Sequence, residues 1–416
     1  KFKRTLIAAS LLAAGTVANA APSNEELWQM MQDMQQQMKD VQMQNQQLKA
    51  ENADLKGKVE ETEQAVEAVV VATEEAASSS LFSSGRTSIG GYGELHYNNL
   101  DDNNGDNDLD QLDFHRFVLF FSHEFTDDLR FWSEFELEHS VAGEGKEGEV
   151  ELEQAYIEYD INDQNRVKGG VFLMPVGIIN ETHEPDTFYG VERNPIENKI
   201  IPSTWWEAGT MFSGDIANGF AYDLAVTSGL DVSKKGDKST FKIRDGRQKV
   251  ANAQANDLAY TGRLKWTAVP GVELSLTAQY QEDITQGNIA ESDDAVLIET
   301  HAVIQQGAFG LRALYAQWDL EGDAPKVAGY DEQTGWYIEP SYKINKNLGV
   351  FARYSAWDNQ AGMSSIESEF EQFDLGVNWW IHKNVVLKLD YQFQDAESDT
   401  ATEREGLNLG LGYQFY

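Results

Sequence analysis

The hydrophobic and polar positions alternate with period two along the longest stretch of the chain, residues 86–416. In residues 272–281, valine, leucine, alanine and tyrosine occupy every second position, and polar or acidic residues occupy the others. Residues 373–381 and 385–393 follow the same pattern. Runs of about 10 to 14 residues with one apolar face and aromatics near their ends are typical of strands that cross an outer membrane.

The connections between these runs alternate in length. Tight turns such as Thr126-Asp127 and Lys383-Asn384 alternate with longer polar segments such as 231–256. Short periplasmic turns and longer external loops are expected of a bacterial barrel. The sequence therefore predicts an all-β transmembrane fold, a 16-stranded antiparallel outer-membrane β-barrel, with a large soluble β-sandwich or propeller as the alternative. In residues 109–125 both faces are partly apolar, so their orientation stays open. The predicted strands are 86–98, 109–125, 128–140, 149–160, 165–176, 204–214, 218–229, 257–268, 271–283, 293–306, 309–320, 333–344, 347–358, 370–381, 384–395 and 404–416.

Residues 24–76 follow a heptad pattern instead. Leucine, methionine and valine recur in alternating steps of four and three from Leu27 to Val69, with Asn45 and Asn52 as polar exceptions. A narrow seam of this length predicts an α-helical coiled coil, which we place in the periplasm. One long amphipathic helix packed on the same chain is the alternative.

The ends of this helical segment have patterns of their own. Residues 1–20 combine a basic start, a short apolar core and the sequence Ala18-Asn19-Ala20. This pattern predicts a secretory signal peptide. Residues 77–85 contain a serine run and are expected to form a linker to the barrel.

The composition excludes several function classes. The chain has 416 residues, a formal net charge of −37 and no cysteine. The acidic balance argues against nucleic acid as a partner, and the lack of cysteine excludes disulfides and thiolate metal sites. HExxH and GxSxG motifs are absent from the sequence. We therefore expect no enzyme activity, no catalytic residues, no cofactor and no metal site.

Two polar groups were candidates for further chemistry. Residues 101–108 are rich in aspartate and asparagine, which suit calcium or the bridging of lipopolysaccharide, but the spacing is not that of an EF-hand and a solvated loop is favoured. His115 and His123 are eight positions apart on one predicted strand. They are expected to share a face about 27 Å apart, too far to share a metal ion.

The third long connection, residues 177–203, carries the functional prediction. It holds three of the eight prolines of the chain, which stiffen a loop. A 16-stranded barrel leaves a wide channel, which such a loop would narrow if it folded into the lumen, and its charges would then select ions. An ordinary external loop is the alternative. The candidate constriction residues are Glu181, His183, Glu184, Asp186, Glu192, Arg193, Glu197 and Lys199.

The wall opposite this loop is expected from inward-facing strand residues, few of them bulky. Residues 85–416 contain 57 acidic and 25 basic side chains, a net charge of −32, which predicts a weak preference for cations. Mixed charge across a gap favours hydrated, polar solutes. The candidate pore-wall residues, chosen by strand parity, are Arg130, Glu134, Glu136, Arg263, Lys265, Arg312, Arg353 and Lys388.

Several motifs resemble those of a known family. They are Gly91-Tyr92-Gly93-Glu94, residues 153–159 (EQAYIEY), residues 168–177 (KGGVFLMPVG), Glu192-Arg193 and Ala208-Gly209. With these residues the chain resembles the phosphate-selective porin O/P family, including relatives with an N-terminal coiled coil. The resemblance implies a sixteen-strand trimeric porin constricted by its third loop. That loop carries only Arg193 and Lys199 against five carboxylates, which argues against phosphate preference.

The sequence thus predicts an outer-membrane porin for passive diffusion of small hydrophilic solutes or ions. We expect a homotrimer in contact with lipopolysaccharide and outer-membrane lipid. Two alternatives stay open. In one, the barrel is a structural anchor whose coiled coil tethers the membrane to peptidoglycan. In the other, the channel is anion-selective, of the phosphate type.

Overall fold

A computed structural model of the chain describes Glu25, Trp28, Gln32, Gln36, Lys39 and residues 86–103, 108–233 and 240–416. The chain divides into two units, residues 1–80 and 81–416. In the first unit the five described residues are helical and exposed. The signal peptide, the heptad seam and the linker lie outside the described residues and stay predictions. Across the described part of the chain, no helix is long and apolar enough to span a membrane.

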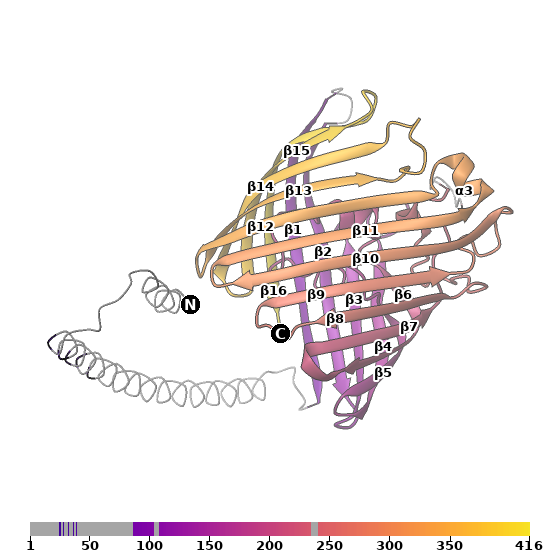
Figure 1. Cartoon of the computed structure of the whole chain (residues 1–416). Coiled ribbons are helices and arrows are strands. Elements are labelled where there is room, and N and C mark those ends of the chain that lie inside the picture. Colours follow the sequence, from indigo (N-terminus) through magenta and orange to yellow (C-terminus); the bar gives the residue numbers. More distant parts are fainter. Residues whose placement is uncertain are drawn as a thin grey trace. The chain divides into compact units, whose positions relative to one another are not determined.

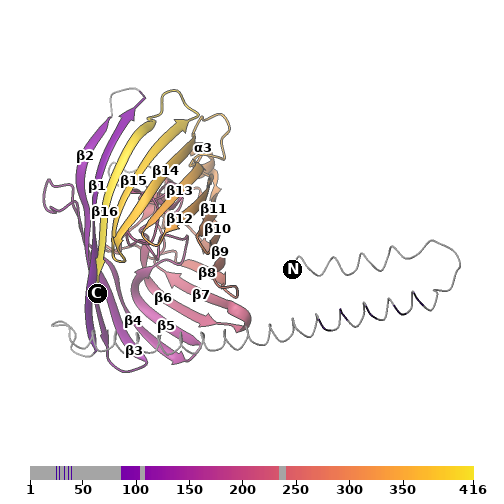
Figure 2. The same ribbon diagram turned by 90° about the vertical axis from the view of Figure 1, so that its left-hand side faces the viewer.

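The second unit is a closed barrel of sixteen antiparallel strands (Figures 1 and 2). Each strand pairs with its neighbours in sequence, and β1 closes the barrel against β16. The predicted strand number and topology are confirmed. The strands are β1 (Thr87–Asp102), β2 (Leu109–Glu124), β3 (Leu129–Glu138), β4 (Val150–Asn162), β5 (Asn165–Leu173), β6 (Trp206–Asp215), β7 (Phe220–Thr227), β8 (Ala259–Trp266), β9 (Val272–Gln281), β10 (Ser292–Gln306), β11 (Phe309–Gly322), β12 (Glu332–Asn345), β13 (Leu348–Asp358), β14 (Glu369–His382), β15 (Val385–Ala396) and β16 (Arg404–Phe415).

The period-two pattern sets the two faces of the wall. On β9, Leu274 and Leu276 are exposed on the outside, while Ser275 between them and Thr277 beyond them are buried inside. Successive side chains of a strand point to opposite faces, so the apolar set lies outward and the polar set lies in the lumen. This arrangement is the one that the alternation predicted for residues 272–281.

The two ends of the barrel differ in their connections. Tight turns, such as 307–308 between β10 and β11, lie at one end, and longer segments, among them 174–205 and 228–258, lie at the other. Gly271 shows why a tight turn requires glycine: its φ is +74°, and a Cβ there would lie 2.1 Å from the carbonyl oxygen of Gln305. Within the described residues of the barrel unit, the short helices lie in the connections: α2 (Ile196–Lys199), η1 (Ala217–Gly219), η2 (Ile243–Gly246) and α3 (Asp323–Ala328).

Strand β2 contains a β-bulge that explains its mixed pattern. Glu94 of β1 pairs with Arg116, but His96 pairs with Asp113, so two residues of β2 lie opposite one residue of β1. Above the bulge Asp113 faces inward, whereas below it Arg116 and Phe120 are the inward residues. A bulge shifts the alternation by one position. A single strand parity for residues 109–125 therefore does not exist.

The same bulge corrects the prediction that His115 and His123 share a face. His115 lines the lumen. His123 lies beyond the bulge, where its ring hydrogen-bonds the Thr87 hydroxyl at 2.7 Å and packs edge-on against Phe125. The two imidazoles are thus separated by the wall as well as by distance.

Candidate functional site

The third long loop, residues 174–205, folds into the barrel. Its Ile196, Ile200 and Ile201 are completely buried, and they pack in one apolar cluster with Trp318 and Tyr337 of the inner wall. Burying apolar surface is favourable at about 25 cal/mol per Å², so this contact holds the loop against the wall.

The inner wall beneath the loop is not uniformly polar. Leu297, Leu314 and Trp318 point inward from β10 and β11 and are almost fully buried. The expectation of few bulky inward residues is therefore wrong for these strands. Strands β10 and β11 bury their inner face beneath the loop and expose their outer face on the outside of the barrel. Both faces of these two strands are therefore apolar beside the loop.

Glu197 organises the loop from within. One carboxylate oxygen accepts hydrogen bonds from the backbone N–H groups of Ile178 and Ile179, both at 2.6 Å. The other accepts from Asn194 Nδ2 at 2.9 Å and from the Tyr337 hydroxyl at 3.1 Å. The side chain is completely buried. The prediction that Glu197 faces the channel is therefore wrong, because its carboxylate is hydrogen-bonded to the backbone of the loop itself.

The tip of the loop, residues 186–191, is fastened to the far wall by its main chain. Three wall residues donate to its carbonyl oxygens: Arg312 to Thr187 at 2.7 Å, Asn378 to Phe188 at 2.9 Å and Trp380 to Asp186 at 3.2 Å. In return, Asp390 accepts from the N–H of Val191 at 2.6 Å.

Two further candidate wall residues meet the same tip. Arg353 donates to the carbonyl oxygen of Tyr189 and pairs with Glu339 and Asp374. The Lys388 ammonium lies 3.6 Å from the centre of the Phe188 ring, a cation–π contact. The alternation of side chains along the strands thus identified residues that contact the loop. They were expected to line the pore, but in the structure they hold the loop in place.

The opposite side of the loop meets β3, β4 and β8. His183 lies 3.1 Å from a carboxylate oxygen of Glu134 and 3.5 Å from one of Glu153. Arg263 pairs with Glu181 of the loop and with Asp223 of β7. These contacts neutralise part of the loop's charge.

The remaining candidates lie at various distances from the loop. Glu136 pairs with Arg116 at 3.4 Å, inside the wall. Arg130 and Lys265 pair with neighbouring wall carboxylates, the latter with Glu273 at 3.7 Å, and the structure shows no contact of either with the loop among the described residues. Glu184 borders a small cavity on the turn side of the loop.

A second loop, residues 228–258, brings basic side chains to the third loop. Arg244 donates to the carbonyl oxygen of Ser203 at 3.0 Å, and Arg247 donates to that of Thr204 at 2.6 Å. Arg193 donates to the Thr204 hydroxyl at 2.8 Å. Within the described residues, none of these three guanidinium groups forms an ion pair. We call Arg193, Lys199, Lys242, Arg244 and Arg247 the basic cluster.

The pKa values in the basic cluster are lowered chiefly by burial, and neighbouring like charges add to the effect. Burial lowers the pKa of Lys199 to about 8, and the charges of Arg244 and Lys242 act in the same direction. Burial also lowers the pKa of Arg193, with the charge of Arg116 adding to the effect. Like charges raise one another's cost of ionisation, so a bound anion would relieve the repulsion.

Glu192, the carboxylate next to Arg193 in sequence, is engaged elsewhere. It accepts from His96 Nδ1 at 3.0 Å and from Asn98 Nδ2 at 3.1 Å. Burial opposes its ionisation, but the His96 charge and these hydrogen bonds hold its pKa well below the usual range. Its negative charge is therefore paired with the wall of β1.

The sequence matches the family described as phosphate-selective porin O and P over residues 89–416, which is most of the chain. The chain belongs to this porin family. It is accordingly an outer-membrane channel protein built on the barrel described above. A relative in Aquifex aeolicus, an uncharacterized protein, is 32% identical over 341 residues, covering 74% of this chain and 76% of that protein.

Solved porin structures share the fold of this porin. An anion-selective porin from Comamonas acidovorans aligns with a TM-score of 0.57 and 14% identity, over 79% of this chain and 99% of that one. The trimer form of OmpT, an outer-membrane protein of Vibrio cholerae, aligns with a TM-score of 0.50 and 9% identity, over 79% and 98% of the two chains. At these identities the likeness concerns the fold.

The third loop separates cavities within the lumen of the porin. On the side of the long loops, a cavity of about 680 Å³ is bordered by Arg193, Lys199 and Lys242. A second one of about 290 Å³ beside it has a lining of mixed charge, with Arg244 and Arg247 on one part and six glutamates, Glu138, Glu147, Glu149, Glu151, Glu153 and Glu192, on the rest. On the turn side, a cavity of about 250 Å³ is bordered by loop residues 181, 183 and 184. The basic cluster thus belongs to the side of the long loops.

Sequence reasoning missed three of the five residues of the porin's basic cluster. Lys242, Arg244 and Arg247 lie in a connection that was expected only to be a long external loop. The available signal was local: residues 242–249 carry four basic side chains in an otherwise acidic barrel. The acidic connection 101–108 is described only in part, and its calcium-binding alternative stays a prediction.

Proposed function

We propose that this porin is a passive channel for small hydrophilic solutes, narrowed by loop 174–205 and selective for anions. The observation that carries the proposal is the basic cluster, which borders the lumen with guanidinium groups held by carbonyl and hydroxyl oxygens rather than by carboxylates. Rings of fixed basic charge at a constriction favour anions. Anion preference replaces the weak cation preference that the net charge suggested.

The carboxylates of the third loop support this choice because few of them are free to repel an anion. Glu197 is hydrogen-bonded inside the loop, Glu181 pairs with Arg263, and Glu192 pairs with His96. Counting five carboxylates against two basic residues therefore overstated the negative charge that a solute meets.

The test is the reversal potential of the purified porin in a planar bilayer under a salt gradient. An anion about 6 Å from one fixed charge gains about 0.7 kcal/mol in water, so each basic residue concentrates anions roughly threefold. The same charge depletes cations roughly threefold, so Arg193→Gln and Arg244→Gln should each lower the anion-to-cation permeability ratio by up to about tenfold. Lys326 is an exposed lysine on α3 that pairs with Glu321. Lys326→Gln is the matched control and should leave the permeability ratio unchanged.

A cation-selective wild-type channel would contradict anion preference. A barrel that inserts but never conducts would favour the second candidate function, a structural anchor whose coiled coil tethers the membrane to peptidoglycan. Removal of residues 24–76 distinguishes the two, because conductance should survive the deletion in a channel while attachment to peptidoglycan is lost in a tether.

We also propose that the porin is a homotrimer in contact with lipopolysaccharide and lipid, with residues 24–76 forming a periplasmic coiled coil. The trimer form of OmpT and the heptad seam support this assembly. Native mass spectrometry of the mature protein should give three chains per particle. A monomer would contradict the proposal.

A further inference from the structure

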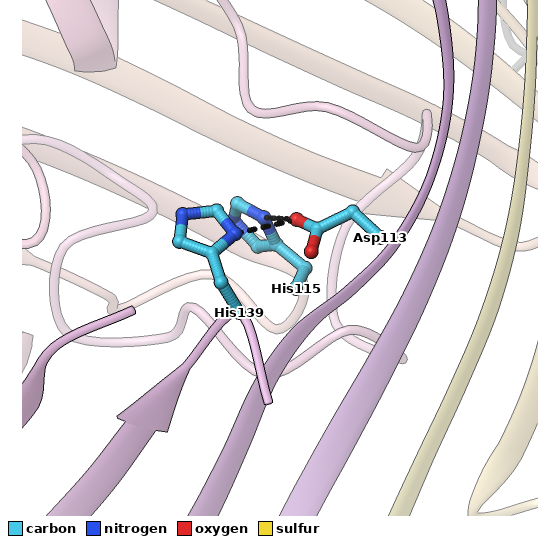
Figure 3. Close-up of side chains that lie close together, drawn as sticks. All are labelled: Asp113, His115 and His139. Carbon is cyan, nitrogen blue, oxygen red and sulfur yellow. Dashed lines mark hydrogen bonds and ion pairs between the residues drawn. The ribbon is translucent and has the colours of Figure 1, made fainter. Parts of the chain in front are cut away.

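The bulge of β2 and the β3–β4 connection bring three side chains together above the third loop. Figure 3 shows Asp113, His115 and His139 converging on one point of the lumen. One oxygen of Asp113 lies 3.2 Å from Nδ1 of His115 and 2.8 Å from Nδ1 of His139. Their ligand atoms all lie within 4.8 Å of one another. From this geometry we propose that the porin binds a divalent transition-metal ion, of the zinc class, at these three residues.

The distances suit the bond lengths of such an ion. Zinc binds imidazole nitrogen and carboxylate oxygen at about 2.0 to 2.2 Å, so two ligand atoms of a tetrahedral site lie roughly 3.3 Å apart. The separation of 3.2 Å from the Asp113 oxygen to His115 matches this value, and the 2.8 Å to His139 would have to lengthen by about half an ångström. Two imidazoles and one carboxylate form the ligand set of many open metal sites, in which water or a solute occupies the remaining position.

The backbone around the cluster is shaped to bring these side chains together. The bulge makes two successive residues of β2, His115 and Arg116, both face the lumen. His139 and Ser140 have φ values of +51° and +59°, a left-handed pair without glycine. The N–H of His139 donates to the carbonyl oxygen of His115 at 3.1 Å, which fixes the loop on the bulge. Bulges and left-handed non-glycine residues concentrate at functional sites.

The site is open to solutes on the side of the long loops. Asp113, His115 and His139 all border the cavity of about 680 Å³. The imidazoles of His115 and His139 are 28% and 33% exposed, which leaves room for an ion to enter. Among the described residues, these three have ligand atoms close enough together to hold one ion and also border that cavity.

Neighbouring charges set the condition for binding. Arg116 Nη2 lies 3.0 Å from Nε2 of His115, so this nitrogen is the acceptor and Nδ1 carries the proton. An ion at Nδ1 moves that proton to Nε2, and Arg116 then turns toward Glu94 and Glu136, which already lie 3.4 Å from it. His96 stacks on the opposite side of His115 at 4.6 Å, with both nitrogens bonded to Glu94 and Glu192.

Zinc chloride titrated calorimetrically into the detergent-purified full-length porin, without a polyhistidine tag, tests the proposal. We expect one saturable site per chain. His115→Ala and His139→Ala each remove a ligand and should weaken binding by more than the roughly 10–100-fold that loss of an outer-shell partner costs. His123→Ala is the matched control on the same strand and should bind as the wild type does. Equal binding by the wild type and the His115→Ala/His139→Ala double variant, or no saturable binding, would overturn the site.

Bilayer recordings provide a second readout and show whether each variant folds. Zinc added on the side of the long loops should lower the wild-type conductance, and a chelator should restore it. Channels of His139→Ala should form normally, because the residue lies in a partly exposed loop. They should be insensitive to zinc, because a ligand is missing. Zinc block that persists in this variant would contradict the assignment. The outcome is independent of ion selectivity, because calorimetry detects the site even in a non-conducting barrel.

Discussion

Replacement of Glu197 by alanine should loosen the third loop without changing its charge toward the channel. The carboxylate accepts two backbone N–H groups of residues 178 and 179, and it is completely buried. Each buried N–H left without an acceptor costs about 1–3 kcal/mol, so the folded loop should lose about 2–6 kcal/mol. Even the lower value changes the ratio of attached to detached loop by about 30-fold.

Single-channel recording measures this effect directly. Glu197→Ala should show larger open-channel current noise and a broader conductance distribution, with the reversal potential near that of the wild type. Glu197→Gln keeps one acceptor oxygen and should be intermediate. Glu184→Ala is the matched control, because it removes a carboxylate from the same loop without releasing those N–H groups. A Glu197→Ala channel with wild-type noise and an altered reversal potential would refute the reasoning, since it would place the carboxylate in the ion path.

Three other perturbations test the packing and charge of the same region. Raising the pH from about 7 to about 9 should weaken the anion preference, because Lys199, whose pKa is lowered to about 8, loses its proton through that range. Lys199→Arg should reduce this pH dependence of the reversal potential. Gly177→Ala should raise current noise as Glu197→Ala does, because its Cβ would lie 2.5 Å from the Glu197 carboxylate at a φ of +80°. Gly412→Ala should shift the loop tip and change the single-channel conductance, because the new Cβ would lie 2.3 Å from Cβ of Pro185; wild-type conductance in that variant would contradict the contact.

The strands of the barrel were predictable because their signals are local. Alternation of side chains and tight turns depends on residues close in sequence, and both are visible without knowledge of tertiary contacts. The first strand was predicted to end at residue 98 but continues to Asp102. Its last residues, which are polar except for Leu100, pair with β16, and Asp102 lies opposite Arg404. That extension depends on a partner about 300 residues away, which a local pattern does not reveal.

The candidate site was predictable only in part. Parity placed Arg312, Arg353 and Lys388 on the inner wall, and all three contact the third loop. The role of Glu197 was not visible, because it depends on how the loop folds back on residues 178 and 179. The contact of Arg244 with the third loop could not be predicted either, because it comes from another long connection and such connections carry no periodic pattern.

The contrast between total and local charge is the reason why the selectivity that we propose does not follow the net charge. The barrel region has a net charge of −32, yet charges are screened over about 8 Å at physiological salt, so most of them are not felt at the third loop. What an ion meets there is the charge left after local pairing. Glu181, Glu192 and Glu197 are already paired or hydrogen-bonded, whereas Arg193 and Arg244 hold only neutral oxygens. If the proposed selectivity holds, it depends on these local groups, and substitutions on distant acidic loops should leave the reversal potential unchanged.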